Sequence, residues 1–206
     1  KNLKALTPDA IFDSVQAVQG KVQGAYSALT IIAGHGLLAF TDPHGIRPLV
    51  LGRKYTDRGM VYAFASETDC FDYLGFELMR DLRPGEAVLI DTAGKVHSRI
   101  CRAGPQAFCV FEYIYFARED SVINGRLVAS ERVCLGRQLA EQVRKAGLQP
   151  DIVIDVPASA YFFASGMAEA LGVPYRRGLA KNNHIGRSFI VPTQARREKI
   201  VRQKLN

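Results

Sequence analysis

The residues of this sequence with the clearest chemical potential lie in a polar loop at positions 181–188. The loop combines one glycine with side chains that donate hydrogen bonds: Lys181, Asn182, Asn183, His184, Gly186, Arg187 and Ser188. Cationic and amide donors bind anionic oxygen atoms, and a glycine lets the backbone approach a ligand closely. The loop therefore predicts a binding site for an anion, and phosphate suits it best.

Positive charge is concentrated around this loop. Residues 176–206 contain nine Lys or Arg and one acid, Glu198, whereas the net charge of all 206 residues is +7. The rest of the chain is therefore close to neutral. A basic run is often only a solvated helix face, but a field this local also attracts anionic partners. Phe189 is the only Phe, Tyr or Trp in 179–206, which disfavours stacking on single-stranded nucleic acid.

Composition excludes several classes of protein. Apolar residues make up 48% of the chain and charged residues 23%, as in ordinary globular domains, and no apolar run approaches the ~20 residues of a membrane span. The four cysteines contain no CxxC pair, so we expect reduced thiols in a cytoplasmic protein: Cys70, Cys101, Cys109 and Cys134. Because the first residue is Lys1 rather than Met, we expect a piece of a longer protein.

The first hundred residues read as short strands with two helices. Thr7 and Pro8 predict the start of a helix that ends near Gly20. Strands are expected at 25–32, 37–40, 48–52, 61–66, 87–91 and 96–100, and a second helix at 68–79. Short strands that follow one another closely favour antiparallel pairing. Glu67, just before the second helix, is expected to cap or pair locally.

The pattern changes beyond residues 103–106, the expected domain boundary. Residues 108–116 predict a long apolar strand that contains one acid, Glu112, to which the sequence assigns no independent role. A helix at 130–147 precedes a branched run at 151–156, which predicts a strand buried on both faces, and a further helix follows. Ser159 comes directly after that strand, where α/β proteins bind ligands, so it is either a helix cap or a contact to a ligand or metal.

Several motifs follow one another in the order of a known family. They are GAY at 24–26, DPHGIRPL at 42–49, ASE at 65–67, PGE at 84–86, FEYIYFAR at 111–118, DIVIDVPAS at 151–159, KN at 181–182, IGRSFI at 185–190 and KLN at 204–206. In this order they resemble the amidophosphoribosyltransferases. The resemblance covers almost the whole chain, and FEYIYFAR and the loop motif are its most specific parts.

The resemblance implies an α+β domain followed by an α/β domain, both incomplete. Residues 1–104 would be the C-terminal part of a glutamine amidotransferase domain of the N-terminal-nucleophile type, a sandwich of antiparallel sheets between helices. Residues 105–206 would be the first part of a type I phosphoribosyltransferase domain, built on a parallel sheet. The family's nucleophile, a cysteine at the mature N-terminus, and its acidic diphosphate-sugar motif have no counterpart in the 206 residues. We therefore expect a fragment that alone catalyses neither half-reaction.

The resemblance also assigns roles to single residues. The loop would close over phosphoribosyl pyrophosphate, and its substrate-binding residues would be Lys181, Asn182, His184, Arg187, Ser188 and Lys204. Arg187 and Lys204 would neutralise the departing pyrophosphate. The hydroxyl of Ser159 would serve Mg²⁺. An ammonia channel between the two sites would be lined by Tyr115, His184 and Ile190.

Departures from the family pattern fall in or near the same segments. Asn183 and His184 stand where the family usually has Arg and Tyr, and a histidine can protonate, so the channel lining would be less inert here. Cys109 matches an iron–sulfur ligand in one branch of the family and a plain buried thiol in another. We favour the thiol, and a 4Fe–4S cluster in the full-length protein stays an open alternative.

The leading interpretation is an enzyme that forms 5-phosphoribosylamine, glutamate and pyrophosphate from glutamine and phosphoribosyl pyrophosphate, the first step of de novo purine synthesis. The alternative is a catalytically inactive module that binds phosphoribosyl nucleotides. The expected partners are phosphoribosyl pyrophosphate, glutamine and inhibitory purine nucleotides, with Mg²⁺ as cofactor. Neither nucleic acid nor membrane is expected as a partner, and the full-length protein is expected to be a homo-oligomer.

Overall fold

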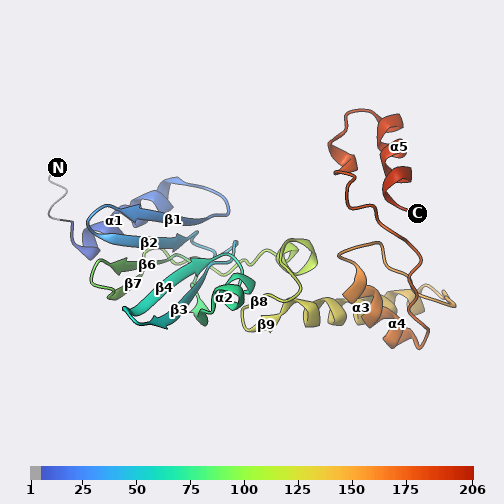
Figure 1. Ribbon diagram of the computed structural model, residues 1–206, viewed down its shortest axis with the longest axis horizontal. Coiled ribbons are helices and arrows are strands. Elements are labelled where there is room, and N and C mark those ends of the chain that lie inside the picture. Colours follow the sequence, from blue (N-terminus) through green and yellow to red (C-terminus); the bar gives the residue numbers. More distant parts are fainter. Residues whose placement is uncertain (1–5) are drawn as a thin grey trace. The chain divides into compact units, whose positions relative to one another are not determined.

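The computed structural model describes residues 6–206, so Lys1 lies outside the described part. The chain divides into two compact units, Lys1–Val128 and Ala129–Asn206, and most of their elements are labelled in Figure 1. Residues 105–128, which the sequence assigns to the second domain, fall within the first unit. The boundary between residues 104 and 105 concerns the family's domains and stays a prediction.

The first unit contains two larger antiparallel sheets, as the short strands of the sequence predict. One has the strand order β1-β2-β6-β7 and consists of β1 Ser27–Ile32, β2 Gly36–Thr41, β6 Glu86–Asp91 and β7 Val96–Ile100. The other has the order β4-β3-β5 and consists of β3 Val50–Thr56, β4 Gly59–Ala65 and β5 Glu77–Asp81. A third sheet is a two-residue ladder between β8 Val122–Ile123 and β9 Arg126–Leu127.

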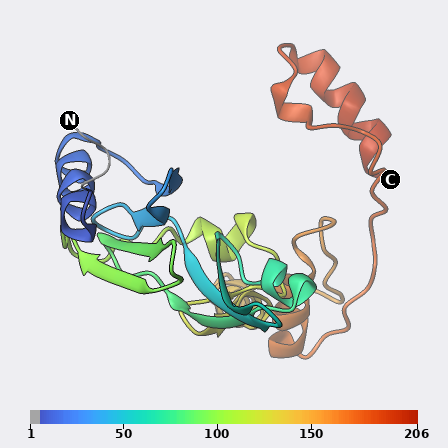
Figure 2. The same ribbon diagram turned by 60° about the vertical axis from the view of Figure 1, so that its left-hand side comes forward.

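Helix α1, Pro8–Lys21, covers one face of the four-stranded sheet (Figure 2). Thr7 caps it as predicted, because its side-chain oxygen accepts a hydrogen bond from the Ala10 N–H at 3.2 Å. The helix places Ile11 and Val15 against strands β2 and β6 in a buried cluster. Val18, expected on the same face, is 41% exposed, so the apolar stripe is shorter than predicted.

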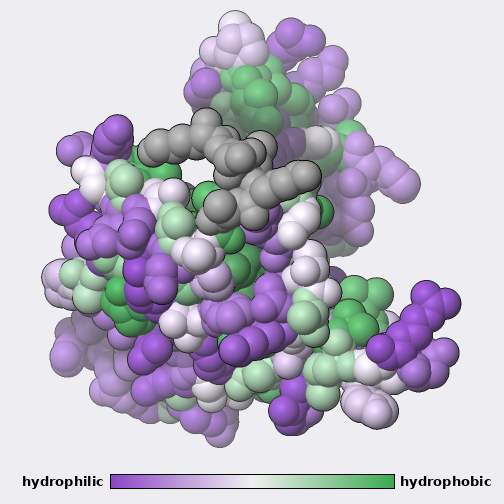
Figure 3. Space-filling model, turned by 90° about the vertical axis from the view of Figure 1, so that its left-hand side faces the viewer, coloured by the Kyte–Doolittle hydropathy of each residue, from purple (hydrophilic) through white to green (hydrophobic). Residues whose placement is uncertain are grey.

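The other face of the four-stranded sheet packs on the three-stranded sheet. Their shared core consists of Ala39, Leu49, Leu51, Leu82 and Val88. Strand β1 is an edge strand, and its Ile31 side chain is 81% exposed. The side of the molecule at which α1 lies shows apolar residues between polar ones (Figure 3).

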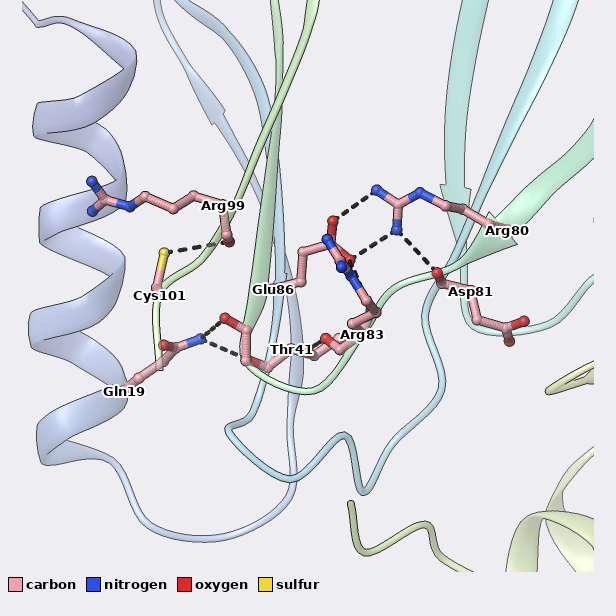
Figure 4. Close-up of polar contacts among 9 residues, drawn as sticks. Gln19, Thr41, Arg80, Asp81, Arg83, Glu86, Arg99 and Cys101 are labelled. Atoms are coloured by element: carbon pink, nitrogen blue, oxygen red, sulfur yellow. Dashed lines mark hydrogen bonds and ion pairs between the residues drawn. The ribbon is translucent and has the colours of Figure 1, made fainter. Parts of the chain in front are cut away.

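A buried carboxylate ties the two sheets together (Figure 4). Glu86 at the start of β6 is fully buried and accepts two hydrogen bonds from the Arg80 guanidinium on β5, at 2.7 and 2.8 Å. It also accepts one from the backbone N–H of Arg83 at 2.8 Å. Beside it, the Gln19 side chain of α1 donates to the Thr41 carbonyl at 2.9 Å.

Two predictions for the first unit are wrong. The expected helix at 68–79 stops early, because α2 spans only Asp69–Leu74 and Gly75 takes a left-handed φ of 68° that ends it. The following residues pair with β3 as strand β5. Residues 108–116 form no strand; they contain the π-helix η2, Glu112–Phe116. A short apolar run suits either helix or strand when its periodicity is unclear.

The second unit is mainly helical. Its elements are α3 Val128–Lys145, which starts at the unit boundary, α4 Tyr161–Leu171, the 3₁₀ turn η3 Ser188–Ile190 and α5 Gln194–Lys204. The helices that the sequence places at 130–147 and after residue 160 are confirmed. None of the helices in residues 6–206 combines the length and the apolar character that a membrane span requires.

The run at 151–156 differs from its prediction. Val153 is buried and forms a single parallel bridge with Tyr175, but Ile152, Ile154 and Val156 are 44–58% exposed. A strand is buried on both faces only where strands and helices surround it. Within the described residues, this run pairs with one neighbour only, so the prediction of burial on both faces is wrong.

Helices α3 and α4 touch through two glycines. A Cβ atom at Gly136 of α3 would lie 2.0 Å from the carbonyl oxygen of Phe163, and one at Gly166 of α4 would lie 2.2 Å from that of Val133. Each glycine therefore admits the backbone of the other helix, and any larger side chain must separate them.

We expect Gly166→Ala to lower the free energy of unfolding by about 2 kcal/mol, since the added methyl meets backbone that cannot rotate away. Chemical denaturation of the chain measures the change. Gly186→Ala is the control, because a Cβ there meets no atom within 4 Å. Equal stability of the two variants would show that the close approach of the helices is not required.

Candidate functional site

A pocket of about 870 Å³ opens in the second unit. It is formed where the turn after residue 156 meets the segment that leads into the polar loop. Its lining residues are Asp155, Pro157, Ala158, Tyr161, Tyr175, Arg177, Gly178, Leu179, Ala180, Lys181, Asn183 and Asn206. Two cations and one carboxylate thus face the same space, which suits a ligand that carries phosphate together with hydrogen-bonding groups.

The carboxylate of the pocket is held by a tyrosine. Asp155 is 7% exposed, and its Oδ1 accepts a hydrogen bond from the Tyr175 hydroxyl at 2.8 Å. This hydrogen bond, with desolvation, raises the pKa of Tyr175. The Tyr175 ring packs edge-on against Tyr161 with ring centres 5.5 Å apart. The two rings and the carboxylate therefore form one connected wall.

The polar loop is fixed at its base by the end of α5. Lys181 forms an antiparallel bridge with Leu205. The Ala180 N–H donates to the Asn206 carbonyl at 2.7 Å and the Asn182 N–H donates to the Lys204 carbonyl at 2.8 Å. The two ends of the segment 180–206, which contains the whole loop, are therefore held together by these contacts.

Two interactions organise the loop itself. The Asn182 side chain accepts a hydrogen bond from the His184 N–H at 3.0 Å, which makes a local turn. The Lys204 ammonium donates to the Gly186 carbonyl at 3.1 Å. Lys204 is thereby brought to the residue that precedes Arg187, although the two cations are 17 positions apart in the sequence.

The structure brings only some of the predicted site residues together. Lys181 lines the pocket, whereas Asn182, His184 and Arg187 are exposed on the loop outside its lining. Ser188 begins η3. Ser159 is exposed in the turn whose neighbours Pro157 and Ala158 line the pocket.

The donor set for a metal is incomplete in the described residues. Residues 6–206 contain no group of three or more His, Cys, Asp or Glu placed to hold a metal ion. Ser159 offers a single hydroxyl, and Mg²⁺ takes six oxygen ligands. Cys109 is a half-buried free thiol, and a 4Fe–4S cluster needs four ligands. These residues by themselves hold neither group.

The predicted channel residues are divided between the units. Tyr115 lies in η2 of the first unit and is 58% exposed. His184 and Ile190 lie in the second unit, and Ile190 is 67% exposed. The ammonia channel stays a prediction.

A second pocket, of about 440 Å³, lies in the first unit. It is lined by Ala25, Tyr26, Ser27, Arg47, Pro48, Ser66, Glu67, Glu112 and Phe116. Arg47 Nη1 lies 2.9 Å from Oε1 of the buried Glu112, and its guanidinium lies over the Phe116 ring, 5.0 Å from the ring centre. Burial raises the pKa of Glu112, against the lowering effect of Arg47.

The sequence suggested that Glu67 caps or pairs locally. In the structure, Glu67 instead joins segments that are distant in the sequence. Its Oε2 accepts hydrogen bonds from the Arg118 N–H at 2.7 Å and the Ser121 hydroxyl at 3.0 Å. Next to it, the Thr68 hydroxyl accepts one from the Val122 N–H at 2.7 Å. The ASE motif therefore holds the end of the FEYIYFAR segment, a role that no local pattern could show.

Among the pocket residues that the sequence did not single out are Asp155, Tyr175 and Arg177. Asp155 gave one signal, since it is the one charged residue in 152–156, where every other residue is Ile or Val. The hydrogen bond from Tyr175 explains how that charge is accommodated when it is buried. Tyr175 and Arg177 gave no comparable signal.

Several known proteins that are similar to this chain carry the same name. Amidophosphoribosyltransferase from Pseudomonas aeruginosa is 43% identical over 203 residues, which cover 97% of this chain and 40% of the relative. The Escherichia coli K12 protein of the same name is 44% identical over 205 residues, 98% of this chain and 41% of the relative. The chain thus spans about two fifths of the length of these relatives. No protein-family model matches it.

A solved structure extends the similarity to the fold. Glutamine phosphoribosylpyrophosphate amidotransferase from Bacillus subtilis, in complex with ADP and GMP, aligns with a TM-score of 0.79 and 38% identity. The alignment covers 99% of this chain and 43% of that one. In sequence and in fold, over nearly its whole length, this chain is therefore homologous to a segment of the amidophosphoribosyltransferases.

Proposed function

We propose that the protein to which this chain belongs forms 5-phosphoribosylamine, glutamate and pyrophosphate from glutamine and phosphoribosyl pyrophosphate, at the start of purine synthesis. The observation that carries the proposal is identity above 40% to amidophosphoribosyltransferases across 97–98% of the chain. In this proposal, residues 1–104 belong to the glutaminase and residues 105–206 to a type I phosphoribosyltransferase domain.

The second unit contributes the electrostatics of the transfer. The nitrogen of ammonia attacks C1 of the ribose, and the bond from C1 to the pyrophosphate oxygen breaks. Pyrophosphate leaves with the bonding electrons, and the nitrogen loses a proton. Negative charge grows on the leaving group, so fixed cations aimed at it lower the barrier. Lys181 in the pocket, Arg187 on the loop and Lys204 at the end of α5 are the cations we assign to this role.

The loop contributes closure. Its base is held by the ladder between residues 180–182 and 204–206, while Asn182, Arg187 and Ile190 are exposed. A loop fixed at both ends can close over a ligand, exclude water and complete the cation set. Mg²⁺, when bound with the substrate, would add positive charge to the diphosphate. The Ser159 hydroxyl is the contact that we propose for it.

The remaining partners follow from the same proposal. Glutamine would supply the ammonia, which a channel lined by Tyr115, His184 and Ile190 would conduct. Purine nucleotides would inhibit the enzyme, and the Bacillus subtilis relative was solved with two nucleotides, ADP and GMP. We further propose a homo-oligomer in the cytoplasm.

The test is an assay of the protein encoded by the complete gene for phosphoribosylamine, with ammonia and with glutamine as nitrogen donor. We expect product from both. We also expect the 206 residues alone to bind phosphoribosyl pyrophosphate in calorimetry without releasing pyrophosphate. Absence of product with both donors from a folded complete protein would overturn the proposal. If that complete protein binds phosphoribosyl pyrophosphate without releasing pyrophosphate, a binding module would be favoured.

A further inference from the structure

We propose that Asp155 determines ligand specificity in the second-unit pocket: its carboxylate, oriented by Tyr175, accepts hydrogen bonds from the hydroxyls of a phosphorylated sugar and disfavours a bare polyanion. The inference rests on the proposed function, because it concerns the same pocket. It goes further by assigning a role to a residue outside the predicted site.

Asp155 is placed where a bound ligand can reach its carboxylate. The residue is buried, yet it lines the pocket together with Arg177 and Lys181. Tyr175 is its one hydrogen-bond partner among residues 6–206, and it occupies Oδ1. A carboxylate has about four acceptor positions on its two oxygens, so Asp155 keeps capacity for donors supplied by a ligand.

The negative charge of Asp155 determines which ligands suit the pocket. A site built only to hold pyrophosphate gains nothing from a carboxylate, because like charges repel at short range. A carboxylate among cations is useful when the ligand has hydroxyl donors beside its phosphate. The sugar hydroxyls of a phosphorylated ribose are such donors. The same carboxylate weakens retention of pyrophosphate once the sugar has left.

The Asp155 carboxylate is held in one orientation by Tyr175. The Tyr175 hydroxyl holds Oδ1 at 2.8 Å, and its ring is packed against Tyr161. Because Tyr175 is also bridged to Val153 through the backbone, both ends of this hydrogen bond belong to one local framework. The remaining acceptor positions therefore have a fixed direction.

The experiment compares two probes, inorganic pyrophosphate and ribose 5-phosphate, by calorimetric titration of the 206-residue chain. Asp155→Asn removes the charge and retains an oxygen that can accept from Tyr175. We expect it to bind pyrophosphate about fivefold more tightly and ribose 5-phosphate no more tightly than the parent chain. Asp151→Asn is the matched control, since Asp151 is an exposed acid of the same segment outside the pocket lining.

Tyr175→Phe separates orientation from charge. It keeps the Asp155 carboxylate but removes the hydroxyl that holds it, so we expect weaker ribose 5-phosphate binding with no gain for pyrophosphate. A purely structural role would lower the thermal stability of both variants and leave the ratio of the two affinities unchanged, which would overturn the inference. If the parent chain binds neither probe, the proposed function itself fails for this pocket.

Discussion

Replacing Arg187 with alanine is expected to lower kcat/KM for phosphoribosyl pyrophosphate by about 10²- to 10³-fold in the complete protein. Arg187 is exposed on the loop and follows Gly186, whose carbonyl is held by Lys204. A guanidinium in this position can bind two oxygens of a diphosphate at once. The loss should fall mainly on kcat, because the charge of the leaving group develops during the reaction.

Two further variants test this explanation. Arg187→Lys keeps the charge but loses the paired N–H groups, so it should recover only part of the activity. Arg196→Ala removes an exposed arginine of α5 in the same basic segment and should change kcat/KM little. If Arg196→Ala and Arg187→Ala had equal effects, the basic segment would act through its total charge rather than through one placed residue.

Local signals account for what the sequence predicted well. Helix α1 was placed to within a residue at its start, because Thr7 and Pro8 are both strong signals of a helix start. The hairpin of β1 and β2 was readable from alternating residues on either side of a glycine turn. These features depend on neighbours in the chain, so they need no knowledge of the tertiary structure.

Contacts between residues far apart in the chain account for the features that the sequence did not predict. Residues 108–116 have the composition of a strand, yet Glu112 at the start of η2 meets Arg47, 65 positions earlier in the sequence. The same holds for Glu67 and Ser121, and for Asp155 and Tyr175. In each case the partner of a carboxylate comes from another part of the chain, and a single sequence does not show which one.

The DPHGIRPL motif illustrates how such contacts build a site. The buried Asp42 side chain accepts hydrogen bonds from the N–H groups of His44 at 2.9 Å and Ile46 at 3.0 Å. These bonds fix the turn that presents Arg47 to Glu112. The sequence indicated the turn through its Pro and Gly, but the target of the arginine became clear only in the structure.

Substituting glutamine for Glu86 is expected to lower the free energy of unfolding by about 3 kcal/mol. Glu86 is fully buried and receives both Arg80 hydrogen bonds as well as the Arg83 N–H. Glutamine would turn an N–H₂ group toward a guanidinium that can only donate. The estimate lies at the low end for a broken buried pair, because the Arg80 side chain is 37% exposed and water can solvate part of it.

The stabilisation by Glu86 depends on pH through the pKa of its carboxyl group. Burial alone would raise the pKa of Glu86, but the hydrogen bonds from Arg80 and Arg83 outweigh it, and the pKa lies below its ordinary value. The stabilisation is therefore complete above the unfolded-state pKa of about 4.3 and is lost as the pH falls through the lower pKa of the folded state. The stability difference between the parent chain and Glu86→Gln should be largest near neutral pH and should shrink in acid.

Denaturant unfolding at neutral and acid pH measures both effects, and Glu77→Gln is the matched control. Glu77 makes a similar two-bond pair with Arg53 across β5 and β3, at 2.9 and 3.3 Å, but both side chains are exposed. Water replaces such a pair readily, so its loss should change stability little. Equal losses in the two variants would show that arginine pairing matters irrespective of burial. A loss confined to Glu86→Gln would show that the buried carboxylate joins the two sheets of the first unit.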